Sequence, residues 1–156
     1  MPHSSRWVVG ALVTAGLGLA GCTAQGGATA PGDSPARVTA VAGTTALRVT
    51  LTERANERLD IRTAVLGEST VTPPEGGPSA VRKTAPYSAL IYDVDGKTWV
   101  FAMTEPRSYL RQEVVVDFVD GETAALTSGP AAGTEIVTVG AAALYGTELG
   151  VGDDAE

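Results

Sequence analysis

The residue best suited to covalent chemistry in this sequence is Cys22, the only cysteine of the chain. It directly follows Leu19-Ala20-Gly21, and the small residues Ala20 and Gly21 let an extended chain enter the narrow site of a signal peptidase. A cysteine thiol is also nucleophilic enough to take up a diacylglycerol group through a thioether. The spacing therefore predicts cleavage between Gly21 and Cys22, followed by lipidation of Cys22.

Residues 1–21 have the organisation of a bacterial lipoprotein signal peptide. Arg6 supplies positive charge near the amino terminus, and Trp7 to Ala20 is an apolar run interrupted by Thr14 and several glycines. A membrane-spanning helix needs about 20 predominantly apolar residues, so this run fits a signal-peptide core better. We expect acylated Cys22 to anchor the mature protein in lipid on the extracytoplasmic face of the cell membrane. The alternative is an ordinary secretory signal with a chance cysteine.

The mature chain lacks the residues that most kinds of catalytic site require. The single histidine, His3, lies in the signal peptide, so the mature chain has no Ser-His-Asp triad, no Cys-His pair and no ordinary zinc site. Asp93 and Asp95 form a carboxylate pair two positions apart. Asp-x-Asp-Gly begins like a calcium loop, but no carboxylate occupies the bidentate position that should follow. We interpret the pair as a hairpin turn, and we expect neither enzymatic activity nor a cofactor or metal.

The chain is acidic, with a formal net charge of −7 at pH 7. Proteins that bind nucleic acid concentrate lysine and arginine on one surface, so nucleic acid is not an expected partner. Arg82-Lys83 forms one small basic spot, and Arg107 with Arg111 forms another. We interpret both as solvated surface.

Composition divides the mature chain into segments. Residues 22–45 are rich in Gly, Ala, Thr and Pro and contain no aromatic residue, which predicts a flexible tether after the lipidated cysteine. A tether of about 23 residues would span ~25–29 Å. Residues 46–150 should form the ordered domain, with an internal Pro/Gly-rich loop at 67–80. Residues 151–156 form an acidic tail.

Alternating apolar and polar residues predict short strands throughout the ordered domain. Leu47 to Leu51 shows this alternation, and Thr52 is placed to cap a short helix. Asp95-Gly96 and Asp120-Gly121 are tight-turn signals, whereas residues 140–149 fit either a helix or a closing strand. We therefore predict a mainly β fold, a small β-barrel or sandwich of six to seven short strands with one short helix.

Three motifs follow one another through the second half of the chain. Pro86 to Ile91 is followed by Asp95 to Phe101, a strand leading through an Asp-Gly-Lys turn into a hydrophobic-aromatic-Val sequence. Ser128 to Gly140 then matches S-G-L-x-x-G-D-x-V-V-x-x-G, with Pro130 in place of Leu and Thr134 in place of Asp. This series resembles a passage in the periplasmic adaptor (membrane fusion protein) family of tripartite efflux pumps.

The resemblance extends upstream, where residues 51–53 and 59–64 are similar to the opening segment of heavy-metal-type adaptors. In that family the two chain ends form a membrane-proximal β-domain around an inserted β-barrel, lipoyl domain and helical hairpin. This chain joins both ends through residues 67–80 and lacks the insertion. The resemblance therefore implies an adaptor-like subunit that contacts a multi-pass inner-membrane efflux transporter but does not reach an outer-membrane channel.

Two other functions fit the same residues. In a ligand- or ion-binding lipoprotein, Trp99, Phe101 and Tyr109 would line a cleft, although aromatic residues on one strand face usually belong to the core. A cell-wall-associated structural lipoprotein is the other alternative.

Replacing Cys22 with alanine tests the lipid anchor. The wild-type chain made in a bacterial host should begin at residue 22, carry acyl mass in intact-mass analysis and partition into detergent, because each buried CH₂ contributes about 0.8 kcal/mol. The Cys22→Ala variant should be unlipidated and remain in the aqueous phase. If the two proteins behave alike and neither carries lipid, the anchor is wrong.

Overall fold

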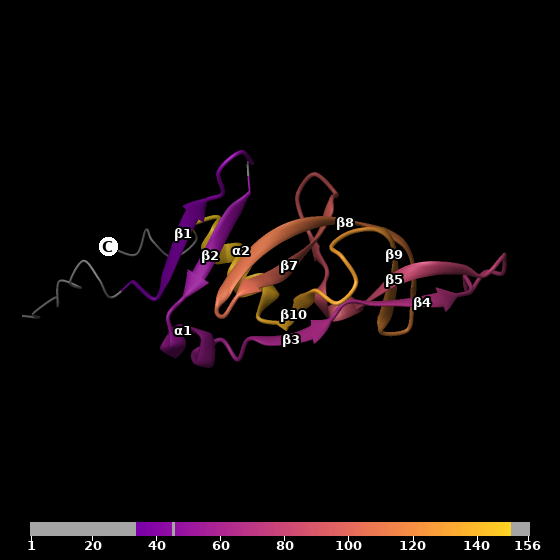
Figure 1. The fold of residues 1–156 in the computed structure, drawn as a ribbon, viewed down its shortest axis with the longest axis horizontal. Coiled ribbons are helices and arrows are strands. Elements are labelled where there is room, and N and C mark those ends of the chain that lie inside the picture. Colours follow the sequence, from indigo (N-terminus) through magenta and orange to yellow (C-terminus); the bar gives the residue numbers. More distant parts are fainter. Residues whose placement is uncertain (1–33, 45, 151–156) are drawn as a thin grey trace, which may run out of the picture.

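A computed structural model of the chain describes residues 34–44 and 46–150 (Figure 1). The predicted cleavage and lipidation site at Gly21 and Cys22, most of the predicted tether and residues 151–156 lie outside these ranges. Within them, no helix combines the length and the apolar character needed to cross a membrane. The described part is mainly β, which confirms the predicted fold class.

Ten strands form the sheet, and every paired neighbour is antiparallel. The strands are β1 (Ala36–Ala40), β2 (Leu47–Leu51), β3 (Arg62–Val65), β4 (Gly67–Val71), β5 (Ala80–Pro86), β6 (Ile91–Tyr92), β7 (Thr98–Glu105), β8 (Ser108–Asp120), β9 (Thr123–Ser128) and β10 (Glu135–Val139). The helices are α1 (Glu53–Arg58) and α2 (Ala141–Glu148), and η1 (Tyr87–Ala89) is a 3-10 turn. In Figure 1, β1, β2, α1 and α2 lie at one end of the molecule, and β4, β5 and β9 lie at the other.

The sheet curls into a half-barrel. Its main strand order is β3-β10-β7-β8-β9-β5-β4, and only Leu66 separates the first strand of this order, β3, from the last, β4. The Leu66 N–H donates to the Thr134 carbonyl at 2.8 Å, and the Gly133 N–H donates to the Leu66 carbonyl at 2.8 Å. The two ends of the strand order are therefore joined through one fully buried residue.

Strand β8 has 13 residues and serves both halves of the sheet. Its first half, Ser108 to Val114, pairs with β7, and its second half, Val115 to Asp120, pairs with β9. The register with β9 shifts on either side of Val116. Bulges of this kind bend a strand and increase its twist, so one strand can follow the curl of the whole sheet.

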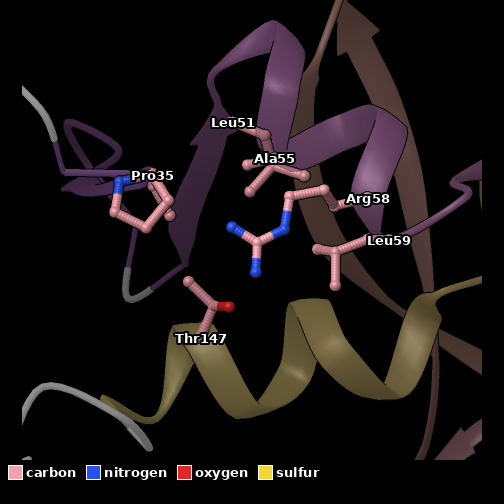
Figure 2. Close-up of a pocket in the computed structure, with 7 residues that line it drawn as sticks. Pro35, Leu51, Ala55, Arg58, Leu59 and Thr147 are labelled. Atoms are coloured by element: carbon pink, nitrogen blue, oxygen red, sulfur yellow. The ribbon is translucent and has the colours of Figure 1, made fainter.

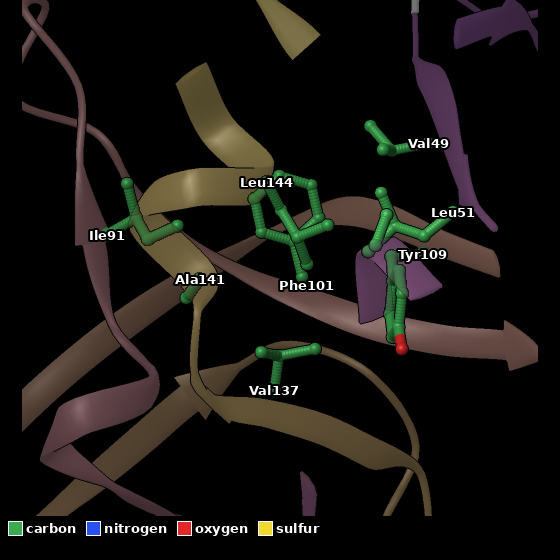
Figure 3. Close-up of a cluster of buried hydrophobic side chains, with 9 residues drawn as sticks. Val49, Leu51, Ile91, Phe101, Tyr109, Val137, Ala141 and Leu144 are labelled. Atoms are coloured by element: carbon green, nitrogen blue, oxygen red, sulfur yellow. The ribbon is translucent and has the colours of Figure 1, made fainter. Parts of the chain in front are cut away.

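Two clusters of buried side chains lie on opposite faces of the sheet. The cluster inside the curl comprises Leu66, Ala85, Ala89, Val100, Val114, Ala124, Leu126 and Ile136. The cluster under α1 and α2, shown in Figure 3, comprises Val49, Leu51, Ala55, Ile91, Phe101, Tyr109, Val137, Ala141 and Leu144. Val100 and Phe101, neighbours on β7, enter different clusters because successive strand side chains point to opposite faces.

Hydrogen bonds fix α1 against the sheet. Thr52 is its N-cap, as predicted, and its hydroxyl accepts from the Ala55 N–H at 3.2 Å. Tyr109 of β8 is 2% exposed and donates its hydroxyl to Asn56 Oδ1 at 2.6 Å. Burial raises the pKa of the Tyr109 phenol, against an opposing effect of Arg107. Because a buried hydroxyl requires a partner, this contact determines where α1 lies.

Two segments that were predicted to be irregular are strands. Residues 36–40, expected within the tether, form β1 and pair with β2 along their full length. Residues 67–71 of the expected loop at 67–80 form β4, which pairs with β5, and only residues 72–79 lie between the two strands. Edge strands expose most of their side chains and therefore carry little apolar pattern. The sheet consequently has ten strands rather than six or seven, and residues 141–148 form a second helix.

Substitution of Gly140 should destabilise the junction between β10 and α2. Its φ is +86°, and a Cβ there would lie 3.3 Å from the Leu59 carbonyl oxygen and overlap the end of the Ile61 side chain. Left-handed backbone costs an ordinary residue roughly 1–2 kcal/mol, so Gly140→Ala should lower the free energy of unfolding by about 2 kcal/mol. Urea unfolding measures this change.

The matched control is Gly150→Ala, because Gly150 also has positive φ, at +73°, but its Cβ position is open. This variant should lose less stability than Gly140→Ala. Equal losses would show that the contacts with Leu59 and Ile61 do not matter.

Candidate functional site

A single carboxylate holds the turn between β6 and β7. Asp93 Oδ1 accepts from the backbone N–H groups of Asp95 at 3.0 Å and Lys97 at 2.9 Å. Its Oδ2 accepts from the Trp99 indole Nε1–H at 2.8 Å. The Asp93 N–H also donates to the Lys97 carbonyl at 3.0 Å. The carboxylate fixes a tight hairpin, which confirms the interpretation of Asp93 and Asp95 as a turn.

These hydrogen bonds also set the charge state of Asp93. Desolvation acts to raise the pKa of the Asp93 carboxyl, but the hydrogen bonds from Trp99, Lys97 and Asp95 outweigh it and lower the pKa below its ordinary value. The carboxylate is therefore charged at neutral pH. Across residues 34–44 and 46–150, no group of three or more His, Cys, Asp or Glu side chains is arranged to hold a metal ion.

Three large side chains on and beside this turn are left in water. Val94 at its tip is 99% exposed, and Tyr92 and Tyr87 are 52% and 47% exposed. Desolvation and then Tyr87 raise the pKa of the Tyr92 phenol. We call Tyr87, Tyr92 and Val94 the hairpin patch. Burying a side chain such as valine contributes about 1.5–3 kcal/mol, and Val94 contributes none of this to the fold.

Behind the turn, Arg111 is enclosed by aromatic rings and a carboxylate. Its guanidinium carbon lies 4.3 Å from the Trp99 ring centre and 5.1 Å from the Tyr145 ring centre. Its Nε donates to Glu148 Oε1 at 3.1 Å and lies 3.0 Å from Oε2. The side chains of Arg111 and Glu148 are 21% and 4% exposed. The prediction of solvated surface is therefore wrong for Arg111, which links β8 to α2.

The ionisation of Glu148 is perturbed by this environment. Burial raises the pKa of the Glu148 carboxyl, while the charge of Arg111 and its hydrogen bond act in the opposite direction. The desolvation of the Glu148 carboxylate therefore raises its pKa more than the charge and hydrogen bond of Arg111 lower it. This pair could not be predicted from the sequence, because Glu148 lies in the segment that fits either a helix or a strand.

The second basic spot expected at the surface is also engaged. Arg82 Nε of β5 lies 2.8 Å from Asp117 Oδ2 of β8. Lys83 Nζ donates to the Gly129 carbonyl at 2.6 Å. The Arg82 side chain remains 30% exposed, so its pairing contributes at most about 1 kcal/mol.

The aromatic cleft considered for a ligand-binding protein is not open. Phe101 is fully buried and Tyr109 is 2% exposed, and both belong to the cluster under the helices. Trp99 contacts Arg111 and Asp93 instead. Trp99 therefore positions the hairpin, whereas Phe101 and Tyr109 fill the core.

A pocket elsewhere in the molecule was not predicted from the sequence. It has a volume of about 290 Å³ and lies between the start of β1, α1 and α2. Its lining residues are Pro35, Ala36, Leu51, Ala55, Arg58, Leu59 and Thr147. Figure 2 shows the Arg58 guanidinium reaching across an otherwise largely apolar wall toward Thr147.

No family model matches the sequence, and no curated protein matches it. The class established by the fold is a mainly β domain with a curled half-barrel sheet. Within the described ranges, its two notable surface features are the hairpin patch and the pocket at Arg58.

Replacing Glu148 with glutamine should change how stability depends on pH. The pKa of Glu148 is raised in the folded protein. Its protonated carboxyl therefore stabilises the fold fully below the pKa of the unfolded chain, near 4.3, and this stabilisation is lost as pH rises through the pKa of the folded protein. Relative to the wild type, Glu148→Gln should therefore gain stability between about pH 4 and neutral pH, by about 1.4 kcal/mol per unit of pKa difference.

Urea unfolding at several pH values measures this gain. Glu113→Gln serves as the control, because Glu113 lies on β8 with a side chain 48% exposed. Parallel stability curves for the wild type and Glu148→Gln would contradict the expected proton linkage.

Proposed function

We propose that this protein is a lipid-anchored, non-enzymatic adaptor-like subunit that binds and modulates an inner-membrane efflux transporter. Cys22 would hold it in the cytoplasmic membrane on the extracytoplasmic face. The hairpin patch would contact the transporter. The observation that carries the proposal is the almost complete exposure of Val94 on a turn that Asp93 holds in one conformation.

A rigid turn with an apolar tip has the properties of an interface anchor. Binding costs free energy when loops and side chains must be ordered, and the Asp93 hydrogen bonds have already ordered this turn. Tyrosine is enriched at protein interfaces, because its ring buries apolar area while its hydroxyl keeps a polar contact. Tyr87 and Tyr92 would surround Val94 in such an interface.

The position of β1 supports a location near the membrane. Because β1 begins at Ala36, the predicted tether after Cys22 would be limited to residues 23–35. A flexible chain of about 13 residues spans ~18–22 Å, less than a tether extending to residue 45 would. A shorter tether raises the effective concentration of the domain at the face of a transporter in the same membrane.

The resemblance to adaptor membrane-proximal domains favours a transporter over other membrane partners. One of the segments that carry it, Asp95 to Phe101, includes one side of the hairpin turn and much of the following strand. Phe101 and Tyr109 are buried, so they do not line an open cleft that could bind a ligand.

Site-specific photo-cross-linking in native membranes tests the proposal. A photoreactive residue at position 94 of the lipidated protein should capture a multi-pass transporter, identified by mass spectrometry. The matched control is position 81 on β5, because Val81 is also exposed, at 60%, but is separate from the hairpin. Capture of lipid alone at position 94, or equal capture at both positions, would count against the proposal.

A charged substitution separates binding from folding. Val94→Asp should weaken capture and co-purification of the transporter by about 10-fold or more, because interface anchors contribute roughly 2 kcal/mol. The melting temperature should stay unchanged, since Val94 is 99% exposed. Unchanged co-purification would remove Val94 from the interface.

A further inference from the structure

The pocket at Arg58 combines an apolar wall with a positive charge that has no acidic partner among residues 34–44 and 46–150. Leu51, Ala55 and Leu59 supply apolar surface, and Arg58 reaches over it (Figure 2). The ion pairs within the described ranges join Arg62 to Asp60, Arg82 to Asp117, Lys97 to Glu113 and Arg111 to Glu148. The matching occupant is therefore a group that carries a carboxylate close to an apolar side chain.

We propose that this occupant is the chain's own segment 151–156, which follows α2. Its sequence, Val-Gly-Asp-Asp-Ala-Glu, contains three carboxylates and begins with an apolar residue. Val151 would lie on the apolar wall, and Asp153 or Asp154 would pair with the Arg58 guanidinium. An arginine fork binds a carboxylate through two parallel hydrogen bonds.

Chain connectivity allows this contact. Thr147 lines the pocket, and at 1.5 Å per residue the end of α2 lies within about one turn of it. The helix ends at Glu148, with Leu149 as its C-cap. The following Gly150 has a φ of +73°, which turns the backbone away from the helical path, and its N–H donates to the Thr147 carbonyl at 3.1 Å. Three to four extended residues then reach about 10–14 Å, enough for Asp153 or Asp154 to approach the opening.

Attachment to α2 also favours this occupant over a free one. A ligand tethered by a short flexible segment acts at an effective concentration in the millimolar range, so it competes well with free ligands present at micromolar concentration. The docked segment would join α2 to α1 and β1 and cover the pocket. The pocket then serves as an internal docking site that holds the tether-proximal end of the domain together.

Paramagnetic relaxation measured by NMR tests the docking in the Cys22→Ala chain. A nitroxide is attached to Ala155→Cys, which becomes the only cysteine because the natural chain has one. Amide signals of Ala36, Ala55 and Leu59 should be strongly broadened, whereas that of Val94 should not. The additional substitution Arg58→Gln should abolish the broadening.

Arg54→Gln is the matched control, because Arg54 lies on the same helix and is exposed but does not line the pocket. It should leave the broadening intact. The proposal is overturned if the wild-type background shows no broadening at the pocket, or if the broadening survives Arg58→Gln.

Two mixing experiments distinguish the other occupants. Broadening that appears between labelled and separate isotope-enriched chains would show a second copy in the pocket. If the labelled segment causes no broadening but added octanoate shifts the Ala55 and Leu59 signals, the pocket takes a free anionic amphiphile. Either outcome overturns the internal docking.

A double-mutant cycle gives the strength of the pair. Arg58→Gln and the combined Asp153→Asn and Asp154→Asn substitution should be coupled by about 2- to 5-fold in the unfolding equilibrium constant. The coupling should fall toward unity at 1 M salt, where the Debye length is about 3 Å. Additive effects at low salt would contradict the pairing.

Discussion

Each strand at the centre of this sheet must supply apolar side chains to two cores at once. Successive side chains of a strand point to opposite faces, so β7 places Val100 inside the curl and Phe101 under the helices. β10 does the same with Ile136 and Val137. This requirement explains the nearly continuous apolar run in β7, since a strand buried on both faces has no polar side to alternate with.

The same constraint determines where the hairpin lies. Phe101 is fixed in the core, so Trp99, two residues earlier on the same face, emerges at the edge of the cluster. There its indole reaches Asp93 at 2.8 Å, and its ring stacks on Arg111. Arg111 in turn pairs with Glu148 of α2. The proposed contact surface is thus linked to the core through one tryptophan, which adds to the hydrogen bonds that Asp93 makes within the turn.

The sequence predicted the features that depend on local chemistry. Asp95-Gly96 identified the hairpin because a tight turn requires positive φ, and Gly96 has φ of +78°. Thr52 identified the start of α1, because its hydroxyl caps a free N–H group. These features can be predicted because each depends only on residues a few positions apart in the chain.

Features that depend on residues far apart in the chain could not be predicted. Strand β1 has almost no apolar pattern, and its pairing with β2 defines it. Arg111 and Glu148 are separated by 37 positions, and only the packing of α2 brings them together. The Arg58 pocket likewise needs β1, α1 and α2 at once. An arginine without an obvious partner in the sequence is usually solvated, so the neighbouring residues do not indicate the contacts of Arg111 or the pocket at Arg58.

The two proposed contacts use different physical forces, and this affects how they respond to the surroundings. The hairpin patch offers Val94 and two tyrosines, so its binding relies on apolar burial and changes little with ionic strength. The pocket at Arg58 relies on a charge pair at an exposed helix, which salt screens. Because the chain has a net charge of −7, attraction at Arg58 is local and operates over about one Debye length. Salt therefore separates the two contacts in one preparation: raising it should release segment 151–156 while leaving a transporter bound through Val94.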